Sequence, residues 1–280
     1  MTNKKILFTG GNGFIGRQII PLIERAGYDV VRPRSTQVRL EVDEEVATLF
    51  SDGQHYDAII HGAIVGGRRD VDDDWGVMHT NLNMFETLYK YIDHTDMFIN
   101  LDSGASYGRQ DDILKVDEKN FGERIPTDYY GLSKYLITQR CRQLNHVYNL
   151  RFFNVFGACA PSNMFTTANI LNYINKREII VFKDKFMDFF GLLDAYKVID
   201  LYLKDYKKLP KELNLVYQPT ILLSEVANMI NNLSDYDVPV KVLEPGYDKS
   251  YCASGAQLSK LNLNLDGLQK SLEYVYESIR

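Results

Sequence analysis

The fold is decided by the stretch Lys5-Ile6-Leu7-Phe8-Thr9-Gly10-Gly11-Asn12-Gly13-Phe14-Ile15-Gly16. Its first five residues form a short apolar run, which predicts a buried parallel strand. Helical periodicity follows through Ile19, Ile20 and Ile23 and stops at Gly27. A glycine-rich turn between a strand and a helix is typical of a dinucleotide-binding loop, although a purely structural glycine turn has the same composition.

The three spaced glycines of this loop have separate tasks. Gly10 permits the tight turn, Gly13 lets the backbone approach a pyrophosphate, and Gly16 lets the helix pack closely on the strand. The start of the helix then offers N–H groups and a positive dipole end to phosphate. We therefore expect the cofactor to contact Gly10, Gly13, Phe14, Ile15 and Gly16.

Alternating strand and helix patterns continue beyond the loop. Strands are predicted at 29–32, 57–61, 97–101 and 150–155, with helices at 43–50, 75–91 and 129–146 and a polar loop at 109–126. This order is typical of an α/β fold, a doubly wound Rossmann sheet of parallel strands. After residue 157 the alternation is less regular, with helices predicted at 164–176, 192–206, 221–233 and 266–279 and strands at 179–182, 213–216 and 238–242.

The irregular second half indicates a smaller C-terminal α/β lobe for substrate. We place the NADP-binding Rossmann domain at residues 1–157 and the substrate lobe at 158–280. A segment near 179–206 is a candidate to return to the first domain. No internal repeat or low-complexity linker separates the two halves.

Composition and charge limit the function classes. The 280 residues are 45% hydrophobic and 25% charged, and the net charge of −5 disfavours nucleic acid as a partner. No apolar run is as long as a membrane span, and the N-terminus carries no signal peptide, so we expect a cytoplasmic protein. The three cysteines indicate reduced thiols, the five histidines lack metal spacing, and Asp70–Asp74 is predicted to be a solvated loop rather than a metal site.

The end of the second strand bears on the choice of cofactor. An NAD-specific enzyme usually carries an acidic residue here, which binds the ribose 2′-hydroxyl. This chain instead has Arg32, Arg34 and Ser35, which suit the 2′-phosphate of NADP(H) or form a solvated basic turn. The third strand ends at His61, predicted to be structural rather than catalytic, and the glycine-rich loop 62–67 follows on the ligand side of the sheet.

A Tyr-x-x-x-Lys pattern marks the candidate catalytic helix. Tyr130 and Lys134 are four residues apart, so they share one helical face, with Thr127 or Asp128 as the N-cap. A cation beside a phenol lowers the tyrosine pKa, which favours proton transfer near neutral pH. The pattern alone fits a surface tyrosine and a solvated lysine equally well, and its weight comes from the glycine loop and the serine segment upstream.

Four motifs together resemble one enzyme family. They are Thr9–Gly16, Ser103 four residues before Tyr107-Gly108, Tyr130-x-x-x-Lys134, and Arg151-Phe152-Phe153-Asn154-Val155-Phe156-Gly157. Over about residues 5–200 the chain is similar to the extended short-chain dehydrogenases, the sugar-nucleotide epimerase, dehydratase and reductase group. The resemblance implies that Ser103 and Tyr130 bond the reacting oxygen, Lys134 binds the nicotinamide ribose, and Asn154 contacts the substrate diphosphate.

Within this family the chain resembles the GDP-fucose synthase-like reductases of GDP-4-keto-6-deoxy sugars. The resemblance assigns Arg34 and Ser35 to the 2′-phosphate and Ala63 to the cofactor. It assigns the substrate to Val65, Gly66, Ser103, Gly104, Ala105, Asn154 and Asn163.

Three departures from that group concern chemistry. Ala105 and Phe165 stand where its epimerising cysteine and histidine are expected, and neither side chain exchanges protons. Met187 replaces an arginine expected near the nucleotide, for which Lys183 or Lys185 are candidate substitutes.

The resemblance therefore implies an NADPH-dependent reductase acting at C4 of a nucleotide-linked 4-keto-6-deoxy sugar without C3 or C5 epimerisation. GDP and a hexose or heptose of a surface polysaccharide are the expected substrate parts. The alternatives are a 4-epimerase, or bifunctional epimerase/reductase, with tightly bound NAD(P), and a non-catalytic NADP(H)-binding protein. A homodimer is expected through the helices at 75–91 and 129–146, of which the second carries Leu132, Leu136, Ile137 and Cys141.

Overall fold

The computed structural model describes residues 4–67 and 72–280. The chain divides into two compact units, which are described in turn. Unit 1 comprises Met1–Gln110, Asn120–Arg151 and Ile199–Leu213, and unit 2 comprises Asp111–Lys119, Phe152–Val198 and Asn214–Arg280. Besides the two halves of the chain, 111–119 belongs to unit 2 and 199–213 to unit 1.

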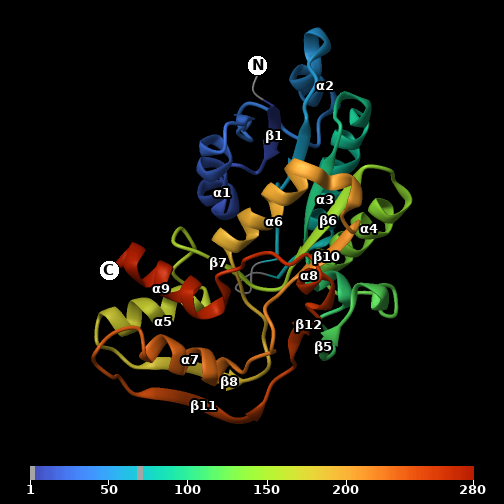
Figure 1. Cartoon of the computed structure of the whole chain (residues 1–280). Helices are drawn as coiled ribbons and strands as arrows, with labels where there is room; N and C mark the ends of the chain where they lie inside the picture. Colours follow the sequence, from blue (N-terminus) through green and yellow to red (C-terminus); the bar gives the residue numbers. More distant parts are fainter. Residues whose placement is uncertain (1–3, 68–71) are drawn as a thin grey trace. The chain divides into compact units, whose positions relative to one another are not determined.

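The central sheet confirms the predicted α/β class. Six strands within the described residues form it, in the order β10-β6-β4-β3-β1-β2. Of these strands, β1, β6 and β10 are labelled in Figure 1. β1 pairs in parallel with β2 and with β3, and β3 pairs in parallel with β4. The strands are β1 (Lys5–Thr9), β2 (Asp29–Val31), β3 (Ala58–His61), β4 (Phe98–Ser103), β6 (Val147–Phe152) and β10 (Glu212–Leu215). The order reverses between β1 and β3, and such a switch point is where open α/β sheets bind ligands.

One face of the sheet packs on the two longest helices of unit 1. Leu7, Ile59 and Phe98 are aligned across β1, β3 and β4 and are buried in one apolar cluster. The cluster also takes in side chains of α3 and α4, as expected from the two-residue alternation of strands. The helices with residues in unit 1 are α1 (Phe14–Arg25), α2 (Asp43–Ala47), α3 (Trp75–Tyr89), α4 (Tyr129–Gln143) and α6 (Leu192–Asp205).

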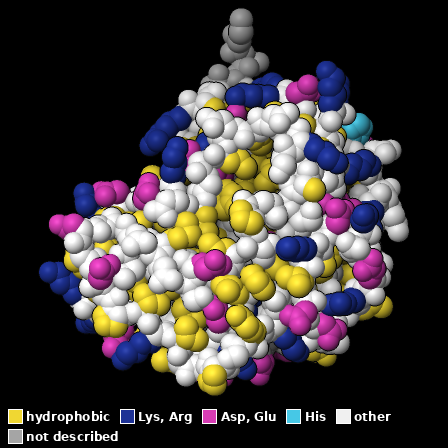
Figure 2. Space-filling model, turned by 60° about the horizontal axis from the view of Figure 1, so that its bottom comes forward, with side chains coloured by type: hydrophobic (Ala, Val, Ile, Leu, Met, Phe, Trp, Pro, Cys, Tyr) yellow, Lys and Arg dark blue, Asp and Glu magenta, His cyan; other side chains and the backbone are white. Residues whose placement is uncertain are grey.

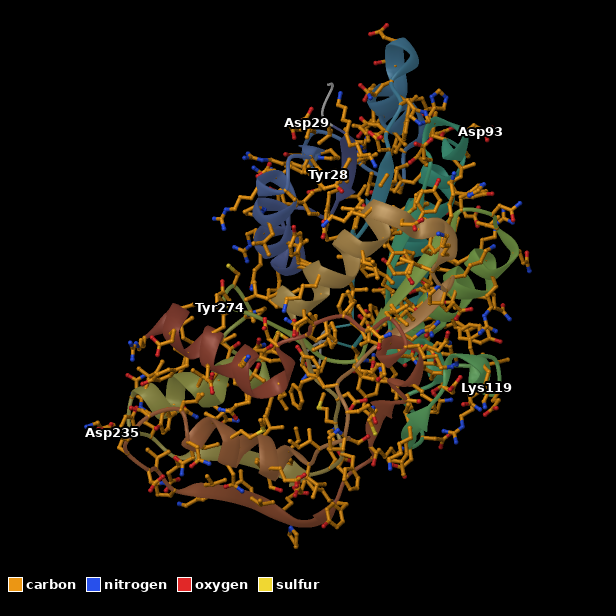
Figure 3. All side chains as sticks on the ribbon, in the orientation of Figure 1. Tyr28, Asp29, Asp93, Lys119, Asp235 and Tyr274 are labelled. Atoms are coloured by element: carbon orange, nitrogen blue, oxygen red, sulfur yellow. The ribbon has the colours of Figure 1, made fainter. Side chains whose placement is uncertain are left out.

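The boundaries of these elements lie close to the predicted ones. Tyr28 and Asp29, labelled in Figure 3, mark the turn from α1 into β2. The helix predicted at 43–50 ends at Ala47 and continues as the 3-10 helix Thr48–Gly53. The helix predicted to reach residue 146 ends at Gln143.

Unit 2 has its own core and several short strands. Its elements are β5 (Ile113–Val116), β7 (Val155–Phe156), α5 (Phe165–Ile174), β8 (Ile179–Asp184), β9 (Phe190–Gly191), α7 (Leu223–Asn231), β11 (Val240–Tyr247), β12 (Tyr251–Ala253), α8 (Ala256–Ser259) and α9 (Gly267–Ile279). Side chains of α5, α7 and α9 pack with β8 around Tyr173, Val181 and Val226. Phe182, Leu243 and Tyr247 are exposed on β8 and β11, and Figure 2 shows hydrophobic side chains interspersed with charged ones on the side it turns forward.

The prediction of a loop at 109–126 was wrong in part. Residues 113–116 form β5, which pairs in parallel with β12, and Glu118–Asn120 form a 3-10 helix. Only Ile113 of the strand is fully buried, so no alternation marks it, and its partner lies far along the chain. Within the described residues, no helix is both long and apolar enough to cross a membrane.

Candidate active site

The glycine loop between β1 and α1 fits a dinucleotide phosphate. Gly10 has φ +70°, and a Cβ at this position would lie 2.6 Å from backbone atoms of Gly62 and Ala63. A Cβ at Gly16 would lie 2.5 Å from the Cα of Gly11. Gly13 is the N-cap of α1, and within the described chain no side chain caps this helix. The first-turn N–H groups of Phe14, Ile15 and Gly16 therefore face the loop, where an anion would bind.

The loop after β3 meets the glycine loop through Thr9. The Thr9 hydroxyl lies 3.4 Å from the Ala63 N–H, which donates to it, and 2.8 Å from His61 Nδ1. Burial, and next the charge of Lys134, lower the pKa of His61 to about 3. The imidazole is therefore neutral, and its geometry agrees with the predicted structural role.

The basic tip of β2 lies beside the same loop. A Cβ at Gly11 would lie 2.9 Å from Cβ of Arg32, which brings the end of β2 next to the glycines. Arg34 and Ser35 are exposed. The backbone N–H of Arg34 donates to Gln37 Oε1 at 3.0 Å, a hydrogen bond that stabilises the turn. The tip can thus present positive charge to a phosphate.

Ser103, Tyr130 and Lys134 come together within unit 1. Ser103 ends β4 and caps the 3-10 helix Gly104–Tyr107, accepting from the Ala105 N–H at 3.2 Å. Its side chain is hydrogen-bonded to that of Tyr130 on α4. Lys134 lies one helical turn further along α4, and its Nζ donates to the Leu101 carbonyl at 2.8 Å. The strand and the helix thus hold the three side chains that the motifs predicted as a group.

The start of α4 is fixed by a side-chain cap. The Asp128 carboxylate accepts from the Gly131 N–H at 2.8 Å, so Asp128 rather than Thr127 is the N-cap. An N-cap of this type satisfies one donor of the first helical turn and fixes where the helix begins. Tyr130 therefore has a defined position at the second residue of α4.

The electrostatics of Tyr130 differ from the sequence prediction. Burial raises the pKa of Tyr130 to about 12, and it outweighs the Ser103 hydrogen bond, which lowers the pKa. Lys134 was predicted to depress this pKa, but its ammonium donates to the Leu101 carbonyl, and the net effect of the surroundings of Tyr130 is to raise its pKa. Burial also lowers the pKa of Lys134, an effect that the Asp102 carboxylate opposes.

Arg109 is a second cation beside the tyrosine. Its guanidinium lies 5.5 Å from the centroid of the Tyr130 ring and lowers the tyrosine pKa. Two hydrogen bonds to Asp128, at 2.8 and 3.2 Å, hold it there. Arg109 was not predicted from the sequence, because it lies in a stretch predicted to be a loop and belongs to no recognised motif.

The loop after β3 also reaches α4. Asn81 of α3 is buried, accepts from the Val65 N–H at 2.9 Å and donates to the Val65 carbonyl at 3.0 Å. Its amide is also 3.1 Å from the Ser133 hydroxyl on α4. Gly66 and Gly67 have φ values of +76° and +75°, and a Cβ at Gly67 would lie 2.6 Å from the Tyr130 ring. Asn81 was missed because a lone asparagine in a helix carries no signal.

The acidic segment after this loop has structural tasks. Asp73 accepts from the Gly67 N–H at 3.1 Å, and Asp74 caps α3 by accepting from the Val77 N–H. Asp70 lies outside the described residues. Across the described ranges, no group of three or more histidine, cysteine or acidic side chains is arranged to hold a metal.

Several predicted substrate residues have defined surroundings. In unit 1, Gly104 and Ala105 are buried next to Ser103. In unit 2, Asn163 is exposed, and the Asn154 carbonyl accepts from the Phe190 N–H at 2.9 Å. Phe165 begins α5 and lies 5.9 Å from the Phe189 ring, within apolar packing.

Met187 belongs to the core of unit 2. It is buried, so it has no surface with which to contact a nucleotide. Of the two candidate substitutes, Lys185 forms an ion pair with Asp248 at 3.3 Å. Lys183 is half-buried on β8.

Comparison with known proteins gives one matching family model. Residues 6–216 match the NAD dependent epimerase/dehydratase family. A relative from Methanocaldococcus jannaschii, named "Putative UDP-glucose 4-epimerase", is 29% identical over 176 residues, which are 54% of this chain and 56% of that protein. The chain thus matches only about half the length of this curated relative.

Solved structures share the fold over nearly the whole chain. A GDP-mannoheptose C4 reductase from Campylobacter jejuni with NADP bound has a TM-score of 0.83 at 14% identity, covering 99% of this chain and 98% of that one. A GDP-D-glycero-L-gluco-heptose synthase from the same organism has a TM-score of 0.85 at 14% identity, with the same coverage. A GDP-L-fucose synthetase from Naegleria fowleri bound to NADP has a TM-score of 0.82 at 16% identity, covering 99% and 93%.

Proposed function

The chain belongs to the NAD dependent epimerase/dehydratase family, and on that premise we propose that it is an NADPH-dependent C4 reductase of a nucleotide-linked 4-keto-6-deoxy sugar. The observation that carries the proposal is the assembly of Ser103, Tyr130 and Lys134 beside a buried Ala105. Ser103, Tyr130 and Lys134 supply the hydrogen bond, the proton and the positive charge that ketone reduction requires of the protein. The methyl group of Ala105 cannot exchange a proton, so the site lacks one group that epimerisation would require.

The chemistry divides between cofactor and protein. NADPH, which the glycine loop and the tip of β2 would hold, would supply the hydride that C4 receives. The Ser103 hydroxyl donates a hydrogen bond to the carbonyl oxygen and stabilises the negative charge that develops there. Tyr130 transfers its phenolic proton to this oxygen and regains one from solvent, while Lys134 and Arg109 supply positive charge near the transient phenolate. The product is the C4 alcohol.

NADP(H) is the cofactor we favour over NAD(H). The glycine loop fits the pyrophosphate of either one, so the tip of β2 decides the choice. Arg34 is exposed there together with Ser35, and no acidic residue at this strand end is available for a 2′-hydroxyl. A guanidinium binds a phosphate through charge-assisted hydrogen bonds.

For the substrate we favour a GDP-linked hexose or heptose that serves surface polysaccharide synthesis. Three proteins of the same fold carry names that refer to GDP-sugars. As substrate residues we propose Val65, Gly66, Ser103, Gly104 and Ala105, together with Asn163 and with Asn154, which would contact the diphosphate. Because Met187 is buried, a group other than this side chain must recognise the nucleotide.

We further propose a cytoplasmic homodimer that pairs α3 and α4 with their counterparts. The apolar surface available for this is smaller than the sequence indicated, since Ile137 and Cys141 are buried in the core of unit 1. Leu132 and Leu136 remain half-buried on α4, and Trp75 is exposed at the start of α3. An isologous four-helix contact would cover these side chains.

A 4-epimerase is the second candidate, because the M. jannaschii relative carries that name. An epimerase returns the hydride to the sugar and consumes no cofactor overall. The test incubates the protein with NADPH and with GDP-, dTDP-, CDP- and UDP-4-keto-6-deoxy sugars, using Tyr130→Phe as the control protein. The proposal expects one NADPH oxidised per sugar reduced with one nucleotide series, and a loss of activity in the control. Interconversion of C4 epimers without NADPH oxidation would establish the epimerase instead.

A further inference from the structure

A buried ion pair lies directly behind the catalytic serine. Asp102 precedes Ser103 on β4 and is 3% exposed, and Arg151 on β6 is 0% exposed. Arg151 Nε donates to Asp102 Oδ2 at 2.7 Å, and its Nη2 donates to Glu212 Oε2 at 3.0 Å. Burying charge is costly, and breaking such a pair leaves an uncompensated ion in the interior. The mechanism above makes no use of this pair.

One oxygen of Asp102 collects hydrogen bonds from three elements. Besides Arg151, its Oδ2 accepts from Asn149 on β6 at 2.9 Å, from Thr138 on α4 at 3.0 Å and from Ser106 of the 3-10 helix at 3.3 Å. The other oxygen, Oδ1, is buried and has no hydrogen-bond partner within the described residues. The carboxylate therefore joins the end of β4 to the elements around it through a single atom.

The same face of α4 carries the catalytic pair. Tyr130, Lys134 and Thr138 follow one another at intervals of four residues, so they lie on successive turns of one face. Lys134 donates to the carbonyl of Leu101, and Thr138 donates to the side chain of Asp102, the next residue of β4. Two adjacent residues of the strand thus hold two adjacent turns of the catalytic helix.

We propose that Asp102 is a positioning residue for the catalytic pair: its buried negative charge, next along β4 from the carbonyl that holds Lys134, stabilises the Lys134 ammonium and joins α4 to the strand that carries Ser103. The inference rests on the proposed function, because it assigns Lys134 and Tyr130 their roles in ketone reduction.

The other titratable groups around Lys134 do not replace this charge. His61 on β3 is neutral, since burial and the ammonium of Lys134 lower its pKa to about 3. Cys141 on α4 stays a thiol, because burial raises its pKa well above the ordinary value. Asp102 raises the pKa of Lys134 against the effect of burial, and it also raises the pKa of Tyr130. Glu212 is held by Arg151 and by Arg142.

Asp102→Asn removes the negative charge of the side chain and keeps the hydrogen bonds that its Oδ2 accepts. Its amide oxygen can take the place of Oδ2 and keep the four donors, while its NH₂ group takes the place of the unpartnered Oδ1. Arg151 keeps its ion pair with Glu212. The matched control is Thr138→Val, which removes one hydrogen bond to the same oxygen and leaves the charge in place. Both variants should fold, because each retains the other bonds of the network.

The direct readout needs no sugar substrate. Protein labelled with ε-¹³C lysine is titrated by NMR, and the Lys134 signal is assigned by its loss in Lys134→Met. Loss of a nearby negative charge disfavours the ammonium, so in Asp102→Asn the Lys134 signal should titrate at lower pH than in the wild type. In Thr138→Val it should titrate as in the wild type. An unchanged Lys134 titration in Asp102→Asn overturns the proposal.

The second readout is the pH profile of NADPH oxidation with the keto sugar. The basic limb should move to lower pH in Asp102→Asn and stay in place in Thr138→Val, because neutralising Asp102 lowers the pKa of both Lys134 and Tyr130. Turnover of Asp102→Asn at neutral pH should fall about tenfold, equivalent to about 1.4 kcal/mol. If no keto sugar is reduced while the NMR shift occurs, the proposed function fails and the role of Asp102 stands. A shifted limb in both variants would mean that packing, not charge, is responsible, and would overturn the proposal.

Discussion

Gly10→Ala should both destabilise the chain and weaken NADPH binding, and Gly27→Ala separates the two causes. Gly10 and Gly27 have φ values of +70° and +92°, so alanine is strained at either position. That strain costs about 1–2 kcal/mol. At Gly27 nothing lies within 4 Å of the added Cβ, whereas at Gly10 it would lie 2.6 Å from backbone atoms of Gly62 and Ala63. Overpacking of this kind adds about 1–3 kcal/mol, so we expect a total of about 2–5 kcal/mol for Gly10→Ala.

The assay combines urea unfolding with a fluorescence titration of NADPH. Because the clash pushes the glycine loop away from the loop after β3, Gly10→Ala should lose at least about tenfold in NADPH affinity, equivalent to about 1.4 kcal/mol. Gly27→Ala should bind NADPH as the wild type does and lose only the strain energy. If the two variants unfold alike and bind NADPH alike, the close approach of the two loops has no energetic consequence and the reasoning is refuted.

Three further predictions concern cofactor choice, substrate and assembly. Arg34→Ala should weaken NADPH binding about tenfold or more and leave NADH binding nearly unchanged, since a charge-assisted hydrogen bond contributes about 1.5–3 kcal/mol. Parallel titrations with both cofactors test this prediction, and equal losses of affinity for NADPH and NADH would contradict it. Asn81→Ala leaves the N–H and carbonyl of Val65 without this partner, so kcat/KM for the keto sugar should fall about tenfold with little change in NADPH affinity; steady-state kinetics at saturating NADPH check it. Light scattering at micromolar concentration should give the mass of a dimer, and Leu136→Glu should shift it toward the monomer; a monomeric wild type would remove the proposed α3–α4 contact.

The parts of unit 1 that carry the cofactor loop could be predicted because their signals are local. The apolar run 5–9, the glycine spacing and the helix beginning at Phe14 lie within one short stretch, and the structure has them there. The Tyr130 and Lys134 spacing likewise needs only the geometry of one helix. Strand pairing over long distances gives no such signal, which is why β5 and its partner β12 were missed.

The electrostatics of the site could not be predicted from spacing alone. The sequence places a lysine one turn from a tyrosine, but the pKa of Tyr130 depends first on burial and then on groups from other segments, such as Ser103 and Arg109. Arg109 and Asn81 act through contacts that join separate segments, so no motif contains them. The same is true of Asp102 and Arg151, whose pairing depends on the order of β4 and β6 in the sheet.

The most direct test of reduction without epimerisation is the reaction in deuterated water. The protein is incubated with NADPH and the GDP-4-keto-6-deoxy sugar, and the product is analysed by NMR. Epimerisation requires groups that remove a carbon-bound proton and return one, and Ala105 and Phe165 provide neither. The account predicts a C4 alcohol whose C4 hydrogen comes from NADPH, with no deuterium at C3 or C5 beyond the background exchange of the ketone. Protein-dependent deuterium at C3 or C5 would contradict it, because another residue would then be moving the proton.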